Sequence, residues 1–278
     1  MTRFGLNSLY KALIFIKELM TINGREIFFN NGSILKSGDL LVQTDLAQTL
    51  ELIAQNGPAG FYEGHTAQKI HSDMRKNGGL ISSADLSNYK AKFRTPIEFN
   101  YKDLTILTMP PPSSGGLILG LMLNMIEQLE LDYSDPHQAE NILKISEIMQ
   151  IAYSLRSVYM ADSDFYDVPK NEFLSKDRAK QLLKNINLKR MSNADDYDPQ
   201  KFKFKENTTH YSIVDGFGNI VSTTTTLNTA FGSGIVIKDT GILMNNEMDD
   251  FSASPSQPNY FGLLGTYANR IEPLKRPL

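Results

Sequence analysis

The sequence predicts an α+β protein, because helical and strand-like patterns occupy different stretches of the chain. Apolar residues recur at helical spacing in several segments before residue 160, whereas from Thr209 the pattern alternates as strands do. A glycine-containing turn at residues 216–219 separates two such alternating segments and indicates a β-hairpin. Helices in one part of the chain and hairpin strands in another are typical of the α+β class.

The first helices are marked by residues that favour helix ends. Asp45 is expected to cap a segment with apolar residues at helical spacing, and residues 56–58, Asn-Gly-Pro, end it. Residues 66–77 repeat this plan, with two glycines as the stop. We expect Ser83 to cap a short third helix.

Two strands are expected next, at residues 95–100 and 104–109, with a turn between them. Three prolines at residues 110–112 then require an extended segment, and Gly115-Gly116 lets the backbone turn into an apolar helix over residues 117–129. A glycine turn before a helix can bind phosphate. Neither a GxGxxG pattern nor a following Lys-Ser/Thr pair is present, so these glycines are interpreted as a tight turn with close packing.

A further helix is expected over residues 139–160, with Met149, Tyr153 and Tyr159 in the core. The hairpin strands then cover residues 209–215 and 220–227. We expect the same sheet to continue through two more short segments, residues 234–237 and 241–244.

The composition excludes several classes of protein. A length of 278 residues allows one large domain or two smaller ones, and 28 basic against 31 acidic residues give no indication of a nucleic-acid partner. The absence of cysteine excludes disulfides, thiolate metal sites and cysteine nucleophiles. No apolar stretch approaches the roughly 20 residues that a transmembrane helix needs. Residues 6–20 are expected to form an amphipathic helix, and no signal peptide is visible.

The junction between Asn207 and Thr208 carries the strongest indication of chemistry. A threonine hydroxyl is a weak nucleophile unless a base removes its proton, and an α-amino group freed by cleavage before the threonine, with a pKa of about 7.7–8.0, can be that base. The charged residues 201–206 read as a loop and the residues from Thr209 as a strand, so a cut would fall between them. Threonine is also common in strands without any catalytic role.

The sequence around this junction distinguishes it from an ordinary strand. Residues 225–229, 231–236 and 241–252 follow in a succession that resembles the γ-glutamyltransferase (γ-glutamyltranspeptidase) family, whose small subunit opens at a nucleophilic threonine. Further segments resemble the same family: residues 38–39, 42–43, 56–58, 61–62, 77–81, 109–116, 156–157, 162, 258–259 and 275–278.

The resemblance implies the domain organisation. It runs from about Gly24 to Leu278 and leaves residues 1–23 without a clear match. Residues 24–207 correspond to the C-terminal part of the large subunit and residues 208–278 to the N-terminal part of the small subunit. The implied fold is the αββα sandwich of the N-terminal-nucleophile hydrolases, incomplete at both ends, and the implied precursor is a zymogen that cleaves itself between Asn207 and Thr208.

The resemblance also implies the catalytic residues. Thr208 matches the nucleophile, which would form a threonyl ester with the γ-glutamyl group, and Thr226 matches the threonine that orients it. Asn228, Glu247 and Asp250 match positions that hold the α-amino and α-carboxylate groups of the substrate, where carboxylates suit an ammonium ion.

The acidic residues, Phe261 and His210 each allow a further interpretation. Glu247, Asp249 and Asp250 could instead form a solvated acidic loop or a metal site, but the EF-hand spacing is absent and no histidine set lies near. Phe261 aligns with the tyrosine of a lid that covers the glutamyl pocket, so the ring is kept and the hydroxyl is lost. His210 is expected to point to the opposite face from Thr209 and need not meet the chemistry.

The resemblance implies a γ-glutamyltransferase or glutathione hydrolase without a cofactor or metal. Its substrates would be glutathione and other γ-glutamyl compounds, with amino acids, peptides or water as acceptors. The large and small subunits of one precursor would be partners of each other. The implied location is periplasmic or secreted. The family's substrate-binding arginine precedes the region of resemblance, and a Ser-Ser pair and an oxyanion-hole Gly-Gly pair would follow Leu278. We therefore expect these residues alone to be inactive. The alternatives are a non-enzymatic remnant and a related acylase, but Asn228, Glu247 and Asp250 favour a glutamyl substrate.

Overall fold

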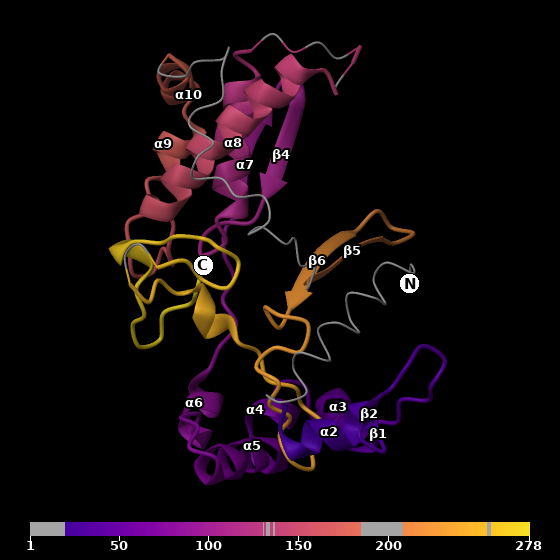
Figure 1. The fold of residues 1–278 in the computed structure, drawn as a ribbon. Coiled ribbons are helices and arrows are strands. Elements are labelled where there is room, and N and C mark those ends of the chain that lie inside the picture. The colour runs from indigo at the N-terminus through magenta and orange to yellow at the C-terminus, as the bar shows by residue number, and fades with distance from the viewer. Residues whose placement is uncertain (1–19, 130, 132–133, 136, 185–207, 255–256) are drawn as a thin grey trace. The chain divides into compact units, whose positions relative to one another are not determined.

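A computed structural model describes residues 20–129, 131, 134–135, 137–184, 208–254 and 257–278 (Figure 1). The chain divides into two compact units. The first comprises residues 1–92 and 204–247, and the second residues 93–203 and 248–278, each within the described ranges. Each unit combines helices with an antiparallel strand pair, so the predicted α+β class is confirmed.

The first unit contains five helices and two strand pairs among its described residues. In chain order these are α2 (Ile22–Phe28), β1 (Phe29–Asn30), β2 (Ser33–Ile34), α3 (Thr44–Asn56), α4 (Ala59–Tyr62), α5 (Gly64–Lys76), α6 (Ser83–Asn88), β5 (Thr208–Val214) and β6 (Ile220–Thr226).

The second unit is mainly helical. Its described elements are β3 (Ile97–Tyr101), β4 (Leu104–Thr108), α7 (Gly115–Ile126), α8 (Ala139–Tyr159), α9 (Lys170–Leu174), α10 (Lys176–Leu183) and the 3-10 turn η3 (Tyr267–Asn269). A further 3-10 turn, η2 (Glu247–Asp250), spans the point where the chain passes between the units.

The helix starts correct two of the predicted caps. Helix α3 begins at Thr44, so Asp45 lies in its first turn, where a negative charge interacts favourably with the helix dipole. Ser82, and not Ser83, caps α6. The Asp85 backbone N donates to Ser82 Oγ (3.2 Å), and the Ser82 backbone N donates to Asp85 Oδ2 (2.7 Å), which closes a capping box. The Ser82 hydroxyl, which donates to Asp85 Oδ2 (2.6 Å), and after it the Ser82 backbone N lower the pKa of the Asp85 carboxyl.

Helices of the first unit contact residues 237–240, which follow the β5–β6 hairpin in sequence. Helices α5 and α6 bury their apolar side chains against Ile237. The buried Thr49 hydroxyl of α3 donates to the Thr240 carbonyl O (2.8 Å), and Lys69 Nζ donates to the Asp239 carbonyl O (2.7 Å). Residues about 170 to 190 positions apart in sequence are thereby fixed side by side.

The predicted continuation of the hairpin sheet is wrong. Residues 234–237 and 241–244 do not pair with β5 or β6; they pair with each other through one bridge, Val236 with Leu243. Gly234, Asp239 and Gly241 have positive φ values of 73°, 56° and 66°, which interrupt the extended conformation that a longer ladder needs.

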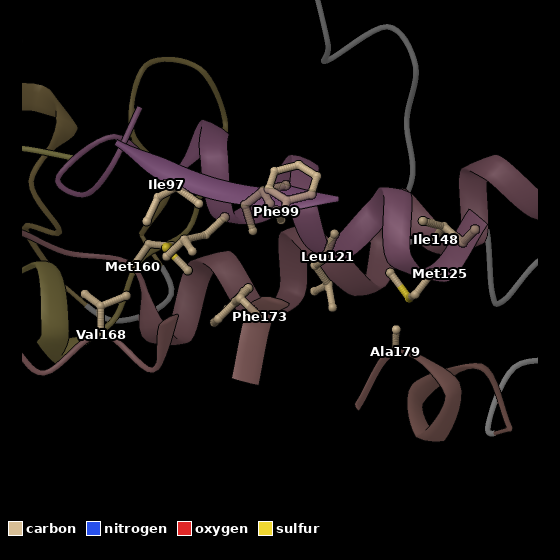
Figure 2. Packing of buried hydrophobic residues seen from close by; sticks show 12 residues of the cluster. Ile97, Phe99, Leu121, Met125, Ile148, Met160, Val168, Phe173 and Ala179 are labelled. Atoms are coloured by element: carbon tan, nitrogen blue, oxygen red, sulfur yellow. The ribbon is translucent and has the colours of Figure 1, made fainter. Parts of the chain in front are cut away.

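The core of the second unit lies between α7, α8, α9, α10 and strand β3 (Figure 2). Leu121 and Met125 of α7 pack with Ile148 of α8. Gly116 confirms the close packing expected of the glycine pair, since a Cβ there would lie 2.2 Å from the Met109 carbonyl O.

One expectation about α8 is wrong. Met149, Tyr153 and Tyr159 are exposed in this unit, and the residues of α8 that are buried include Ile148 and Ala152.

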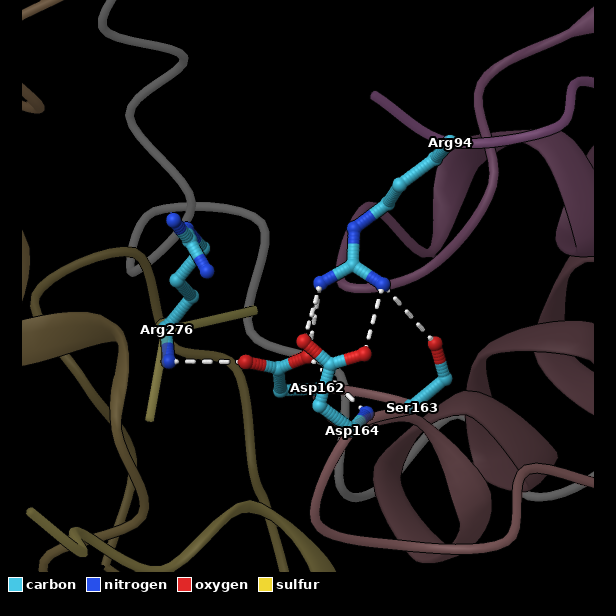
Figure 3. A network of polar contacts seen from close by, with 5 residues as sticks. All are labelled: Arg94, Asp162, Ser163, Asp164 and Arg276. Carbon is cyan, nitrogen blue, oxygen red and sulfur yellow. Dashed lines mark hydrogen bonds and ion pairs between the residues drawn. The ribbon is translucent and has the colours of Figure 1, made fainter. Parts of the chain in front are cut away.

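A buried carboxylate fixes the end of the chain in the second unit (Figure 3). Asp162, fully buried, accepts hydrogen bonds at Oδ1 from Arg94 Nη2 (3.1 Å) and the Asp164 backbone N (3.2 Å). Its Oδ2 accepts from the Arg276 backbone N (3.0 Å). Arg94 also donates to Ser163 and Asp164, and the bond to Asp164 is the main cause that raises the pKa of the Arg94 guanidinium.

Two further predictions concern a helix near the N-terminus and the lack of a membrane-spanning helix. The amphipathic helix expected over residues 6–20 falls, except for Met20, outside the described residues. Among the helices that the structure describes, none is both long and apolar enough to cross a bilayer.

Candidate active site

The β5–β6 hairpin brings the two predicted catalytic threonines together. The strands pair so that Thr208, the first residue of β5, lies directly opposite Thr226, the last residue of β6. Thr208 Oγ1 donates to Thr226 Oγ1 over 3.4 Å, a long hydrogen bond. Both side chains are exposed in this unit, as a nucleophile that must meet a substrate requires.

A residue in the left-handed conformation, two positions after Thr226, supports that threonine. Asn228 has φ 74°, a conformation that Asn tolerates better than most residues, and it is buried. Its backbone N donates to Thr226 Oγ1 (2.9 Å), and its side-chain Nδ2 donates to the Asn246 carbonyl O (3.2 Å). The predicted substrate-binding Asn228 therefore contacts the predicted orienting threonine.

Asn246 connects this turn to the acidic segment. Its backbone N donates to the Leu227 carbonyl O (3.2 Å), and its Oδ1 accepts from the backbone N and the hydroxyl of Thr229, both at 3.2 Å. The next residue is Glu247, whose backbone N donates to Asn245 Oδ1 (3.0 Å). The first unit thus places Thr208, Thr226, Asn228 and Glu247 along one hydrogen-bonded stretch.

Asp250 belongs to the second unit and has its own set of contacts there. Its Oδ1 accepts from Asn259 Nδ2 (3.0 Å), and its carbonyl O accepts from Nδ2 of the buried Asn269 (2.7 Å). Phe261 lies two residues beyond Asn259, half-buried, with its ring edge-on to Tyr260 at 5.2 Å between centroids. The second unit therefore links the predicted ammonium-binding carboxylate to the predicted lid.

Arg156 is a charged residue near Asp250 to which no role was assigned from the sequence. Its Nε donates to Ser114 Oγ (2.9 Å), so it joins α8 to the start of α7. Burial lowers the pKa of the Arg156 guanidinium, and the charges of Tyr153 and Asp250 act in the opposite direction. The resemblance had marked both segments, but only the fold shows that they meet.

His210 shares a face of the hairpin with Thr208, the predicted nucleophile. As expected, it points away from Thr209, and strand alternation therefore places it on the same side as Thr208. Its Nδ1 lies 2.7 Å from Thr224 Oγ1 and its Nε2 lies 3.1 Å from Ser222 Oγ. Strand alternation alone predicts that residues 208 and 210 share a face.

Asn207, on the other side of the expected cleavage point, lies outside the described residues. Within the described ranges no group of three or more His, Asp or Glu side chains is arranged to hold a metal ion, and Glu247, Asp249 and Asp250 are no exception.

The sequence is similar to proteins of one family. The profile of the gamma-glutamyltranspeptidase family matches residues 8–278, a range that begins before Gly24. The glutathione hydrolase proenzyme of Escherichia coli is 45% identical over 258 residues, which cover 92% of this chain and 44% of that protein. The glutathione hydrolase proenzyme of Bacillus subtilis is 34% identical, with 94% and 46% covered. The chain thus spans about half the length of the curated relatives that it matches.

Solved structures agree with this result. Helicobacter pylori gamma-glutamyltranspeptidase is similar with a TM-score of 0.64 and 36% identity, over 71% of this chain and 57% of that one. A cephalosporin acylase from Bacillus halodurans has a TM-score of 0.80 over 100% of this chain and 48% of that one, and its identity of 24% indicates a shared fold alone. These neighbours are N-terminal-nucleophile hydrolases, so the predicted fold class is confirmed. The chain belongs to the gamma-glutamyltranspeptidase family.

Proposed function

We propose that this chain belongs to an enzyme that hydrolyses or transfers the γ-glutamyl group of glutathione and related amides. The observation that carries the proposal is the pairing of Thr208 with Thr226 at the open end of the hairpin, with 3.4 Å between their hydroxyl oxygens. A nucleophile at the first position of a strand, next to a hydroxyl that can orient it, suits N-terminal-nucleophile catalysis.

In the proposed maturation step, the chain is cut between Asn207 and Thr208. The Thr208 hydroxyl attacks the Asn207 carbonyl carbon, the carbon–nitrogen bond to Thr208 breaks, and the hydroxyl proton passes to the nitrogen, which leaves an ester and a free α-amino group. Water then hydrolyses the ester, releases Asn207 as a carboxylate and restores the Thr208 hydroxyl. The freed amine then acts as the general base for later turnovers, because its ordinary pKa of about 7.7–8.0 lies close to neutral pH. The product is a large and a small subunit from one precursor.

In the proposed reaction, the amine takes the proton of the Thr208 hydroxyl while Oγ1 attacks the γ-carbonyl carbon of the substrate. The carbon–nitrogen bond breaks, the proton passes to the leaving amine, and the glutamyl group remains as an ester on Thr208. Water or an acceptor amine then attacks this ester and restores the hydroxyl. Thr226 orients the nucleophile through its hydroxyl.

Asn228, Glu247 and Asp250 hold the α-amino and α-carboxylate groups, and Phe261 closes over the glutamyl pocket. The Asn259 contact supports Asp250 in this role, since it holds in place a carboxylate that must accept from an ammonium ion. We place the enzyme in the periplasm or outside the cell, on the basis of its family.

An acylase acting on other amides is the second candidate. The likeness to the cephalosporin acylase concerns the fold alone, and the acidic pair Glu247 and Asp250 favours a substrate with a free α-ammonium group. An inactive remnant is the third.

The test compares wild type with Thr208→Ala in the protein as its gene encodes it. We expect wild type to yield two fragments, the smaller with Thr208 as its first residue by N-terminal sequencing, and to release p-nitroaniline from γ-glutamyl-p-nitroanilide. Thr208→Ala should do neither. Normal maturation of Thr208→Ala would contradict the assignment of the nucleophile, and an uncut, inactive wild type would favour the remnant.

A further inference from the structure

A compact turn carries Phe261. The Asn259 backbone N donates to the Leu263 carbonyl O (3.0 Å), and the Gly262 backbone N donates to the Asn259 carbonyl O (2.9 Å). Gly262 has φ 78°. A closed three-residue loop whose last residue is left-handed is a common hairpin connection, and glycine suits that last position. Phe261 stands at the middle of this loop.

The Asn259 side chain organises the loop from within. Its Oδ1 accepts from the Phe261 backbone N (3.1 Å) and from the Leu263 backbone N (2.9 Å). An Asn oxygen that accepts from the residue two positions later is the usual way in which Asn stabilises a turn. The amide oxygen is thereby fixed, and with it the direction in which the amide nitrogen points.

That nitrogen bonds the carboxylate proposed to bind substrate. Asn259 Nδ2 donates to Asp250 Oδ1 (3.0 Å), and Asn269 Nδ2 holds the Asp250 carbonyl O (2.7 Å). Next to it, the Tyr260 backbone N donates to Asp249 Oδ2 (2.7 Å). A carboxylate has roughly four acceptor positions, so the bond from Asn259 is compatible with a further bond from an ammonium ion.

We infer that Asn259 is a positioning residue that joins the Asp250 carboxylate and the Phe261 turn into one hydrogen-bonded assembly. The inference rests on the proposed function, in which Asp250 pairs with the substrate ammonium and Phe261 covers the pocket. A carboxylate that is already held in one orientation loses less side-chain freedom when the substrate binds. Substrate binding and the position of the lid turn are then coupled through one amide.

The chain offers a matched pair of substitutions. Asn259→Ser keeps a short hydroxyl that can accept from the Phe261 backbone N, but it removes the amide that reaches Asp250. Asn219→Ser makes the same change at the hairpin turn, where Asn219 Nδ2 donates to Asp215 Oδ2 over 2.7 Å. Both variants lose an amide-to-carboxylate bond without adding charge, and only Asn259 contacts the proposed site.

The first measurement is steady-state hydrolysis of γ-glutamyl-p-nitroanilide by the protein as its gene encodes it. Because a hydrogen bond to a charged group is lost, Asn259→Ser should raise KM about tenfold or more with kcat little changed, and Asn219→Ser should leave both near wild type. In an Asp250→Asn background, Asn259→Ser should add much less to KM, since the residue acts through Asp250. Additive effects of the two substitutions, or a wild-type KM in Asn259→Ser, would overturn the inference.

A second measurement does not depend on activity. The sequence contains no tryptophan, so Phe261→Trp introduces a reporter into the lid turn of this chain. Acrylamide should quench the introduced indole more strongly when Asn259→Ser is added than when Asn219→Ser is added, at temperatures where both variants are folded. Equal quenching would overturn the coupling of the turn to Asp250. An inactive wild type with a quenching difference would instead contradict only the proposed function.

Discussion

Replacement of Thr226 by valine tests whether its hydroxyl orients the nucleophile. Valine keeps the branched shape of threonine and removes the oxygen that lies 3.4 Å from Thr208 Oγ1 and 2.9 Å from the Asn228 backbone N. A neutral hydrogen bond contributes about 0.5–1.5 kcal/mol, which corresponds to about a two- to tenfold decrease in kcat. The bond to Thr208 is long, so we expect a slow enzyme and not an inactive one.

The same substitution should also destabilise the fold. Asn228 is buried, and its backbone N loses the acceptor that Thr226 supplies, which costs about 1–3 kcal/mol of unfolding free energy. Urea unfolding measures this loss, and p-nitroaniline release from γ-glutamyl-p-nitroanilide measures kcat in the cleaved protein.

The control is Thr225→Val, one residue earlier on the opposite face of β6. It should keep kcat and stability near wild type. If Thr226→Val kept the wild-type kcat while stability fell, the hydroxyl would serve only the turn at Asn228 and the orienting role would be refuted. Equal losses of kcat in the two variants would indicate a general effect of valine on the strand.

Two further predictions follow from the second unit. Asp250→Ala should raise KM for glutathione and for γ-glutamyl-p-nitroanilide about ten- to a hundredfold, because the substrate ammonium loses a charged partner. Cleavage after Asn207 should persist. A wild-type KM on both substrates would contradict the role of Asp250. Arg94→Ala leaves the fully buried Asp162 without its ionic partner, so urea unfolding should show a decrease of about 3–5 kcal/mol in the free energy of unfolding. An unchanged free energy of unfolding would show that the backbone donors to Asp162 are sufficient to stabilise its charge.

The sequence predicted the local features well where one turn determines the geometry. The hairpin strands and their turn were placed within a residue, and the register that brings Thr208 opposite Thr226 follows from the turn. The capping error had a signal that was available: only Ser82 has an acidic residue three positions later, at Asp85, as a capping box requires.

Contacts between distant segments could not be predicted in the same way. No period or motif relates Arg156 to Ser114, which are brought together by the packing of α8 against α7. The short apolar segments around Val236 and Leu243 resemble strands, but positive φ values on either side of Val236 keep them from joining the hairpin sheet.

The candidate site illustrates how these two kinds of information combine. The resemblance supplied Asp250 and Phe261 as separate residues with separate roles. The fold adds Asn259, whose amide oxygen shapes the turn under Phe261 and whose amide nitrogen bonds Asp250. Because both groups belong to one rigid amide plane, a movement of the turn changes the position of the carboxylate's donor. If Phe261 belongs to a lid and Asp250 binds substrate, as proposed, the two should respond to the same substrate because they are joined through Asn259.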